Sequence, residues 1–142
     1  MTRVFLDTSV LFAATLSSTG ASREIISLGL AGRLTLVLSD YVIEELRGAL
    51  KRKAPESVSA VDDFLQALEF ENVRPSKREV LSVAEYTELK DAPVVAAAVK
   101  ARVDYLVSLD RRHLVDRPEV EDGSGLRIVL PGDLLHLLRS NS

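Results

Sequence analysis

The sequence contains no cysteine, has no excess of positive charge and has no long uninterrupted hydrophobic run. Without cysteine there is no disulfide framework, no thiolate metal site and no cysteine nucleophile. This absence agrees with a reducing compartment, so we expect a cytoplasmic protein. The apolar N-terminal stretch is interrupted by Asp7 and is shorter than the ~20 residues of a membrane span. We therefore expect no membrane segment and no signal peptide at this end.

The net charge of −3 and the pI of about 5.4 argue against a protein that holds nucleic acid by its overall charge. A polyanionic partner would have to bind local basic clusters or bound cations. Two such clusters are present, at residues 51–53 and 111–113. The two histidines, His113 and His136, are far apart and show no histidine-based catalytic pattern. We therefore expect His113 to be an ordinary surface residue, with assistance in proton transfer as the alternative.

The composition, 46% hydrophobic and 27% charged, suits a single globular domain over residues 1–142. Short apolar runs predict strands at residues 4–6, 34–38, 72–74, 105–108 and 127–130. Helical segments are predicted at residues 22–31, 40–53, 56–70, 79–89, 92–102 and 131–139. This alternation predicts an α/β fold in which helices cover both faces of a mostly parallel sheet of about five strands.

Several acidic residues are predicted to meet at one edge of this sheet. Ligands of open parallel sheets bind beyond the carboxyl ends of the strands. Asp7 directly follows the first strand, and Asp110 lies just past the fourth. Asp91 opens the helix that returns the chain to the start of the fourth strand, so it should lie at the same edge. Asp104 precedes that strand and belongs to the opposite edge.

Helical geometry separates two adjacent glutamates in the predicted helix 40–53. Its apolar stripe consists of Val42, Ile43, Leu46, Ala49 and Leu50. At about 100° per residue, Glu45 lies roughly 90–100° from the centre of this stripe, whereas Glu44 lies roughly 160° away. Glu45 is therefore the glutamate expected to reach the edge of the sheet.

Each acid also has a purely structural interpretation. Asp91 would be a helix cap, Asp110 would stabilise a turn, and Glu45 would be a solvated helix residue. Asp7 is harder to explain in this way, because a carboxylate at the end of a core strand needs a partner, a ligand or a cleft.

Four carboxylates at one edge would repel each other unless a cation neutralised them. Oxygen-only ligands select hard cations, so we expect Mg²⁺ or Mn²⁺. Such an ion activates water and binds phosphate, and its charge would attract nucleic acid to an acidic protein.

The sequence resembles the PIN-domain ribonucleases, in particular the toxin components of toxin–antitoxin pairs. The resemblance rests on four blocks in order: VFLDTSVL, LSDYVIEEL, KDAPVVAAAVKARVDYLVSLDRRHL and IVLPGDLLHLL. It implies a three-layer α/β/α sandwich and metal-dependent cleavage of RNA, with Mg²⁺ or Mn²⁺ as cofactor. The acids that match the family's metal-binding and catalytic positions are Asp7, Glu45, Asp91 and Asp110.

The sequence departs from the family pattern at three places. Ser9 stands where asparagine is common, and Ser108 stands where threonine is common. The further acid sometimes found after the fourth aspartate is absent, with Asp116 as an uncertain substitute. Ser9 is a candidate for binding phosphate or for capping the next helix. Arg111 and Arg112 are candidates for substrate contacts, with solvated loop charge as the alternative.

Other functions fit the sequence less well. A phosphatase of the haloacid-dehalogenase type needs a second aspartate where Ser9 stands, and a receiver domain needs paired acids near the first strand. The main alternative is a degenerate PIN domain that binds RNA or protein without cutting, although all four acids are intact. The resemblance also implies a small antitoxin partner and allows a homodimer through helices 22–31 and 56–70.

Overall fold

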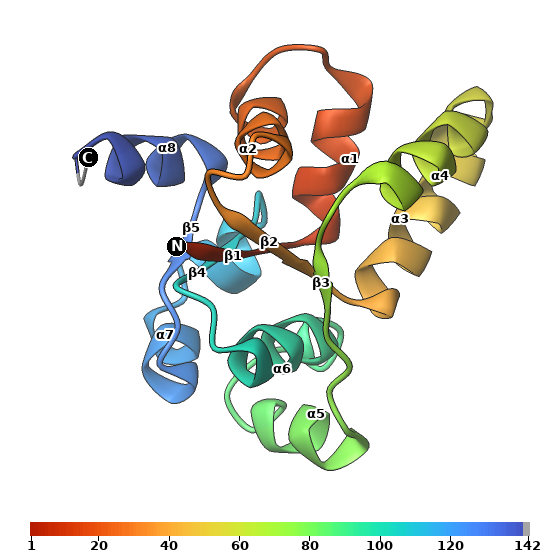
Figure 1. Ribbon diagram of the computed structural model, residues 1–142. Coiled ribbons are helices and arrows are strands. Elements are labelled where there is room, and N and C mark those ends of the chain that lie inside the picture. The colour runs from red at the N-terminus through yellow and green to blue at the C-terminus, as the bar shows by residue number, and fades with distance from the viewer. Residues whose placement is uncertain (141–142) are drawn as a thin grey trace.

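Five short aliphatic runs form one parallel sheet (Figure 1). The computed structural model describes residues 1–140. The strands are β1 (Arg3–Leu6), β2 (Thr35–Leu38), β3 (Glu71–Asn72), β4 (Tyr105–Val107) and β5 (Ile128–Val129). Their order is β3-β2-β1-β4-β5. Phe5 of the central strand pairs with Val37 on one side and Leu106 on the other, so β1, β2 and β4 end nearly level.

Helices pack against both faces of the sheet and confirm the predicted α/β fold. Figure 1 shows α1 and α2 over one face, and α5 and α6 over the other. The helical elements are α1 (Thr8–Leu16), α2 (Ala21–Leu30), α3 (Asp40–Lys53), η1 (Pro55–Ser57), α4 (Val58–Ala67), α5 (Lys77–Val83), α6 (Ala92–Ala101), η2 (Arg111–Val115), α7 (Pro118–Ser124) and α8 (Pro131–Ser140). None of the helices within residues 1–140 is long and apolar enough to cross a bilayer.

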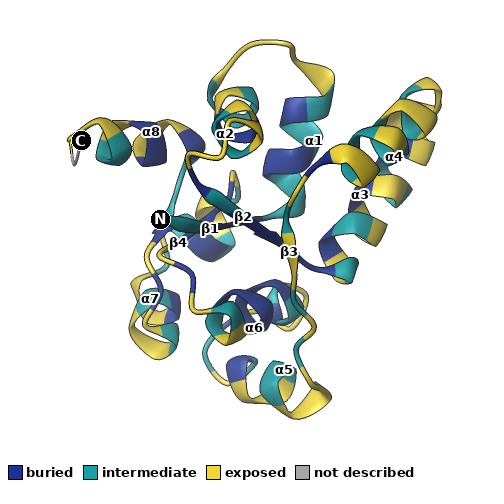
Figure 2. Ribbon diagram, in the orientation of Figure 1, coloured by how far each residue is buried: buried dark blue, intermediate teal, exposed yellow. Residues whose placement is uncertain are grey.

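The central strand lies in the middle of the hydrophobic core (Figure 2). Val4, Phe5 and Leu6 have no exposed surface. Burying a side chain of this size stabilises the fold by about 1.5–3 kcal/mol. On the face of the sheet that α5 and α6 cover, α6 is buried from Val94 to Ala98. The chain therefore leaves the core at Asp7 from one of its most firmly held strands.

Three helical elements were not predicted from the sequence. In α1, Val10 and Leu11 are buried and Phe12 is half-buried, so the helix is apolar on most sides and shows no amphipathic period. Helix α7 begins with Pro118 and is followed by Gly125 at φ 74°, a common pair of end signals. The third, η2, is a π-helix, which is a rare element.

The predicted helix 79–89 is wrong at both ends. Helix α5 begins at Lys77, after a capping box in which Ser76 and Glu79 bond each other's backbone. It ends at Val83, and turns carry the chain to α6. In those turns the Tyr86 ring packs against Gly123, where an added Cβ would come within 2.5 Å of the ring.

The other boundaries differ by small amounts. The predicted helix 56–70 is divided into η1 and α4 and ends at Ala67, and the predicted strand 72–74 is the pair Glu71–Asn72. The predicted single domain ended at residue 142, and its last two residues, 141 and 142, lie outside the described range.

Candidate metal centre

The four acids come from different elements that meet at the carboxyl edge of the sheet. Asp7 joins β1 to α1, and Asp110 lies between β4 and η2. Asp91 immediately precedes α6, and Glu45 lies in α3. The charges of Asp7 and Asp110 both act on the Asp91 carboxyl, so these three acids lie within electrostatic range of one another.

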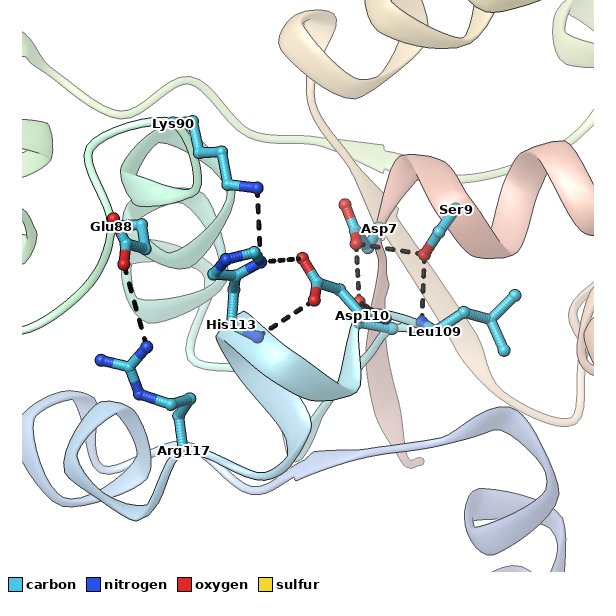
Figure 3. A network of polar contacts seen from close by, with 9 residues as sticks. Asp7, Ser9, Glu88, Lys90, Leu109, Asp110, His113 and Arg117 are labelled. Atoms are coloured by element: carbon cyan, nitrogen blue, oxygen red, sulfur yellow. Dashed lines mark hydrogen bonds and ion pairs between the residues drawn. The ribbon is translucent and has the colours of Figure 1, made fainter.

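Asp7 accepts three hydrogen bonds, and its contact with Ser9 is shown in Figure 3. Its Oδ1 accepts from the Thr8 backbone N–H at 2.8 Å. Its Oδ2 accepts from the hydroxyls of Ser108 at 2.7 Å and Ser9 at 3.2 Å. Burial raises the pKa of the Asp7 carboxyl, these hydrogen bonds lower it, and the charge of Asp110 raises it. Asp7 is thus a rigid carboxylate in an apolar setting that disfavours its charge.

The two serine hydroxyls connect the ends of β1 and β4. Ser108 is fully buried, and its Oγ accepts from the Asp110 backbone N–H at 3.0 Å. The Oγ of Ser9 accepts from the Leu109 N–H, also at 3.0 Å. Each hydroxyl therefore receives one hydrogen bond and passes another to Asp7. Ser9, the predicted phosphate contact, is used in the structure to position Asp7.

Asp91 has an unsatisfied carboxylate. It occupies the N-cap position of α6, but its side chain makes no capping hydrogen bond, which contradicts the capping interpretation. Its Oδ2 is buried and has no hydrogen-bond partner within residues 1–140. Burial raises the pKa of this carboxyl, Asp110 and Asp7 raise it further, and the neighbouring Lys90 and His113 oppose the change. A buried carboxylate oxygen without a donor is costly, and a bound cation would satisfy it.

Asp110 faces a histidine that the sequence analysis treated as an ordinary surface residue. Its Oδ1 accepts from the His113 backbone N–H at 3.0 Å, and its Oδ2 lies 3.2 Å from the His113 Nδ1 (Figure 3). The His113 side chain is only 23% exposed. Ligand atoms of Asp91, Asp110 and His113 all lie within 4.8 Å of one another. Asp7 and Glu45 border this trio without belonging to it.

Glu45 approaches the site and Glu44 does not. The Glu45 Oε1 accepts from the Thr8 hydroxyl at 3.0 Å, next to Asp7. Glu44 instead acts on the charge of Arg74. Both glutamates are exposed, so they differ in the direction in which their side chains point and not in burial.

Tyr41, one turn before Glu45, is a site residue that the sequence analysis missed. Burial raises the pKa of its hydroxyl, and the charges of Glu45, Asp91 and Asp7 raise it further. It therefore lies in the combined field of three of the acids. Nothing in the sequence around a tyrosine in the first turn of an amphipathic helix indicates that it will lie close to these acids.

The two arginines after Asp110 have different surroundings. The Nε of Arg111 forms a 3.1 Å ion pair with Asp116 Oδ2, and both side chains are largely exposed. Asp116 therefore neutralises an arginine and does not act as an additional acid of the site. Arg112 is exposed and has no hydrogen-bond or ion-pair partner in the described part of the chain.

Comparison with known proteins identifies the family. The family model described as PIN domain matches residues 3–112. The chain belongs to the PIN domain family. No curated protein sequence matches it significantly.

Solved structures share the fold of this PIN domain. VapBC2 from Rickettsia felis, bound to a DNA fragment from its promoter, aligns with a TM-score of 0.64 at 21% identity, over 90% of this chain and 98% of that chain. VapC20 from Mycobacterium tuberculosis, a sarcin-ricin loop cleaving toxin, gives 0.53 at 19% identity, over 77% and 91%. FitAcB from Neisseria gonorrhoeae gives 0.61 at 15% identity, over 90% and 97%.

The side chains of this PIN domain fit a divalent cation. The available donors are carboxylate oxygens, which suit Mg²⁺ or Mn²⁺, and one imidazole, which suits a transition-metal ion. The free oxygen of Asp91 needs a positive partner. The raised pKa values of Asp7 and Asp91 show that the fold alone does not stabilise their charges. A cation bound between them would supply this stabilisation.

Proposed function

We propose that this PIN domain is a metal-dependent endoribonuclease and the toxin of a toxin–antitoxin pair. The observation that carries the proposal is the buried, unpartnered oxygen of Asp91 beside Asp110 at the carboxyl edge of the sheet. Such an arrangement is expensive in a protein that binds no cation there. The similarity to VapC20, a toxin that cleaves the sarcin-ricin loop, supports RNA as the substrate.

The four acids would hold Mg²⁺ or Mn²⁺, and the chain positions them for this purpose. A bound divalent ion supplies an activated water and positive charge for a phosphodiester. Asp7 is fixed by Ser9 and Ser108, so its carboxylate is ordered before any ligand arrives. Glu45 is exposed and accepts from the Thr8 hydroxyl beside Asp7, which places it to orient a water or a ribose hydroxyl.

Local basic groups would hold the RNA, because the whole protein carries a charge of −3. Arg112 has no partner among the described residues, so it is available to a phosphate. Arg111 is paired with Asp116 at the surface and would have to exchange that partner for a phosphate. We therefore assign the stronger substrate contact to Arg112. With RNA as its substrate, the enzyme would act in the cytoplasm.

The proposed partner is a small antitoxin that covers the acidic site. The similar structures VapBC2 and FitAcB are toxin–antitoxin complexes, which supports such a partner here. Homodimerisation stays a prediction. The helices expected at its interface, α2 and α4, line an apolar groove with α1 and α3 that includes Leu11, Ile26, Leu46, Val61 and Phe64.

Cleavage of a mixed pool of RNAs tests the proposal. The purified protein should cut RNA with Mn²⁺ or Mg²⁺ and not with a chelator, and Asp7→Asn should reduce the rate by at least about 100-fold. Uncut RNA that still binds the protein under all conditions would instead identify a non-catalytic binding domain. Equal cleavage by the wild type and Asp7→Asn would point to a contaminating nuclease.

A further inference from the structure

The Nδ1 atom of His113 has two neighbours that it cannot satisfy together. It lies 3.2 Å from the Asp110 Oδ2, which only accepts hydrogen bonds when ionised, and 3.3 Å from the Lys90 Nζ, which only donates (Figure 3). A protonated Nδ1 can donate to Asp110 but repels Lys90. An unprotonated Nδ1 can accept from Lys90 but leaves two lone pairs facing each other.

A divalent cation resolves this conflict, because the imidazole lone pair and the carboxylate oxygen can both bind it. We propose that His113 is a nitrogen ligand of the metal ion at this site, and that it makes the site select Mn²⁺ over Mg²⁺. The inference rests on the proposed metal dependence and adds a ligand to the four acids. It also commits to one of the two ions.

The observed spacing suits shared ligation. In an octahedral shell with bonds of about 2.1 Å, neighbouring ligand atoms lie about 3 Å apart. The Nδ1 of His113 and the Oδ2 of Asp110 are separated by 3.2 Å, and an oxygen of Asp91 completes a group within 4.8 Å. The His113–Asp110 pair thus already has the spacing of neighbouring ligands, and the Asp91 oxygen would move closer to complete the shell.

The π-helix η2 brings the histidine to this position. The carbonyl of Asp110 accepts from the Val115 N–H at 3.0 Å, and the carbonyl of Arg111 accepts from the Asp116 N–H at 2.8 Å, both five residues apart. Within this turn Asp110 bonds the backbone N–H of His113 and lies beside its ring. Single π-turns occur often at functional sites.

Lys90 is the group that the ion would replace. Its side chain is exposed and can move away, and its charge lowers the pKa of the Asp91 carboxyl. In the metal-free protein the ammonium therefore acts as a weak internal counter-ion. A nitrogen ligand changes which ion displaces Lys90, since Mg²⁺ takes oxygen ligands, whereas Mn²⁺, a transition-metal ion, can add an imidazole to its oxygen ligands.

Pulsed electron paramagnetic resonance of Mn²⁺ bound to the full chain tests the proposal without RNA. The wild-type spectrum should show nitrogen modulation from a coordinated imidazole. His113→Gln should lose this modulation. The matched control His136→Gln, which changes the exposed histidine of α8, should keep it. Absence of the modulation in the wild type, or its persistence in His113→Gln, would overturn the proposal, and the wild-type spectrum decides even if the variant fails to fold.

Calorimetric titration with each metal alone tests the selectivity. The wild type should bind Mn²⁺ at least about tenfold more tightly than Mg²⁺, and His113→Gln should lose most of this preference. An unchanged ratio of the two affinities would contradict the proposed ligand. Nitrogen modulation without RNA cleavage would refute the nuclease proposal alone, and metal-dependent cleavage without the modulation would refute the histidine ligand alone.

Discussion

The hydroxyl of Ser108 donates a 2.7 Å hydrogen bond to the Oδ2 of Asp7 and joins the ends of two neighbouring strands. The same hydroxyl accepts from the Asp110 backbone N–H. Ser108 is completely buried, so this small group relates the positions of two of the four acids in a place that water does not reach. The geometry of the metal centre therefore depends on a residue that does not itself belong to the set of proposed ligands.

Replacing Ser108 with alanine should weaken both the fold and the site. The change leaves the Asp110 N–H without its acceptor and removes one of the three donors to Asp7, which should cost about 1–3 kcal/mol of unfolding free energy. The loss of a donor to the carboxylate should also raise the pKa of Asp7 further. Urea unfolding of the metal-free protein measures the first effect.

A suitable control is Ser82→Ala, at an exposed position of α5, which should change stability by less than about 0.5 kcal/mol. Similar losses for Ser82→Ala and Ser108→Ala would show that the hydroxyl of Ser108 has no special role.

The pH dependence of metal-free stability should reveal the buried acids. The pKa values of Asp7 and Asp91 are raised, so the folded protein holds these protons more tightly than the unfolded chain. Their contribution is complete below the unfolded aspartate pKa of about 3.9 and is lost as the pH rises through the folded pKa. Asp91→Asn should therefore be as stable as the wild type near pH 4 and more stable at pH 7, with a Tm higher by about 2–4 °C.

Comparing the wild type with Asp91→Asn separates the pH dependence caused by Asp91 from the pH dependence caused by the paired surface acids. Those acids have lowered pKa values and give the opposite slope in both proteins; they are Asp40, Glu71, Glu79 and Glu119. Thermal unfolding in chelator at several pH values provides the measurement. A constant difference in Tm across the pH range would mean that the ionisation of Asp91 is not responsible.

Adjacent glutamates of α3 should behave differently in catalysis. Glu45→Gln should slow RNA cleavage by about 10–100-fold, because this side chain faces Thr8 and the acids. Glu44→Gln should remain within about twofold of the wild type, since that side chain faces Arg74. Initial rates of cleavage at saturating Mn²⁺ make the comparison. A larger loss for Glu44→Gln would refute the assignment.

Lys90→Met should strengthen metal binding. The substitution removes a cation that lies 3.3 Å from the His113 Nδ1 and acts on Asp91, so the affinity for Mn²⁺ should rise by about threefold or more. Lys77→Met, at an exposed position of α5, is the matched control and should leave the affinity unchanged. Weaker Mn²⁺ binding by Lys90→Met would show that the lysine assists the ion and does not compete with it.

The sequence predicted the strands well, and sheet topology correctly placed Asp91 and Asp110 at the same edge. Buried parallel strands consist of continuous apolar residues, and the topology places Asp7 and Asp110 at the same edge. The 3.6-residue period distinguished Glu45 from Glu44. These inferences needed no knowledge of how distant side chains pack.

The sequence could not predict the features that depend on such packing. His113 lies in a π-turn, and Asp91 follows the turns between α5 and α6, where its Oδ2 is buried without a partner among the described residues. Helix α1 was missed because it is apolar on most sides. These features could not be predicted because the sequence around each of them carries no local signal for it.

The central claim is that Asp91 and Asp110, beside Asp7, form one metal centre at the carboxyl edge of the sheet. Anomalous diffraction from crystals grown with Mn²⁺ tests it most directly. We expect an anomalous peak within bonding distance of the Asp91 and Asp110 carboxylates, which disappears in Asp91→Asn. The claim would be contradicted if the protein cuts RNA with Mn²⁺ but its crystals show the anomalous peak elsewhere or no peak at this edge.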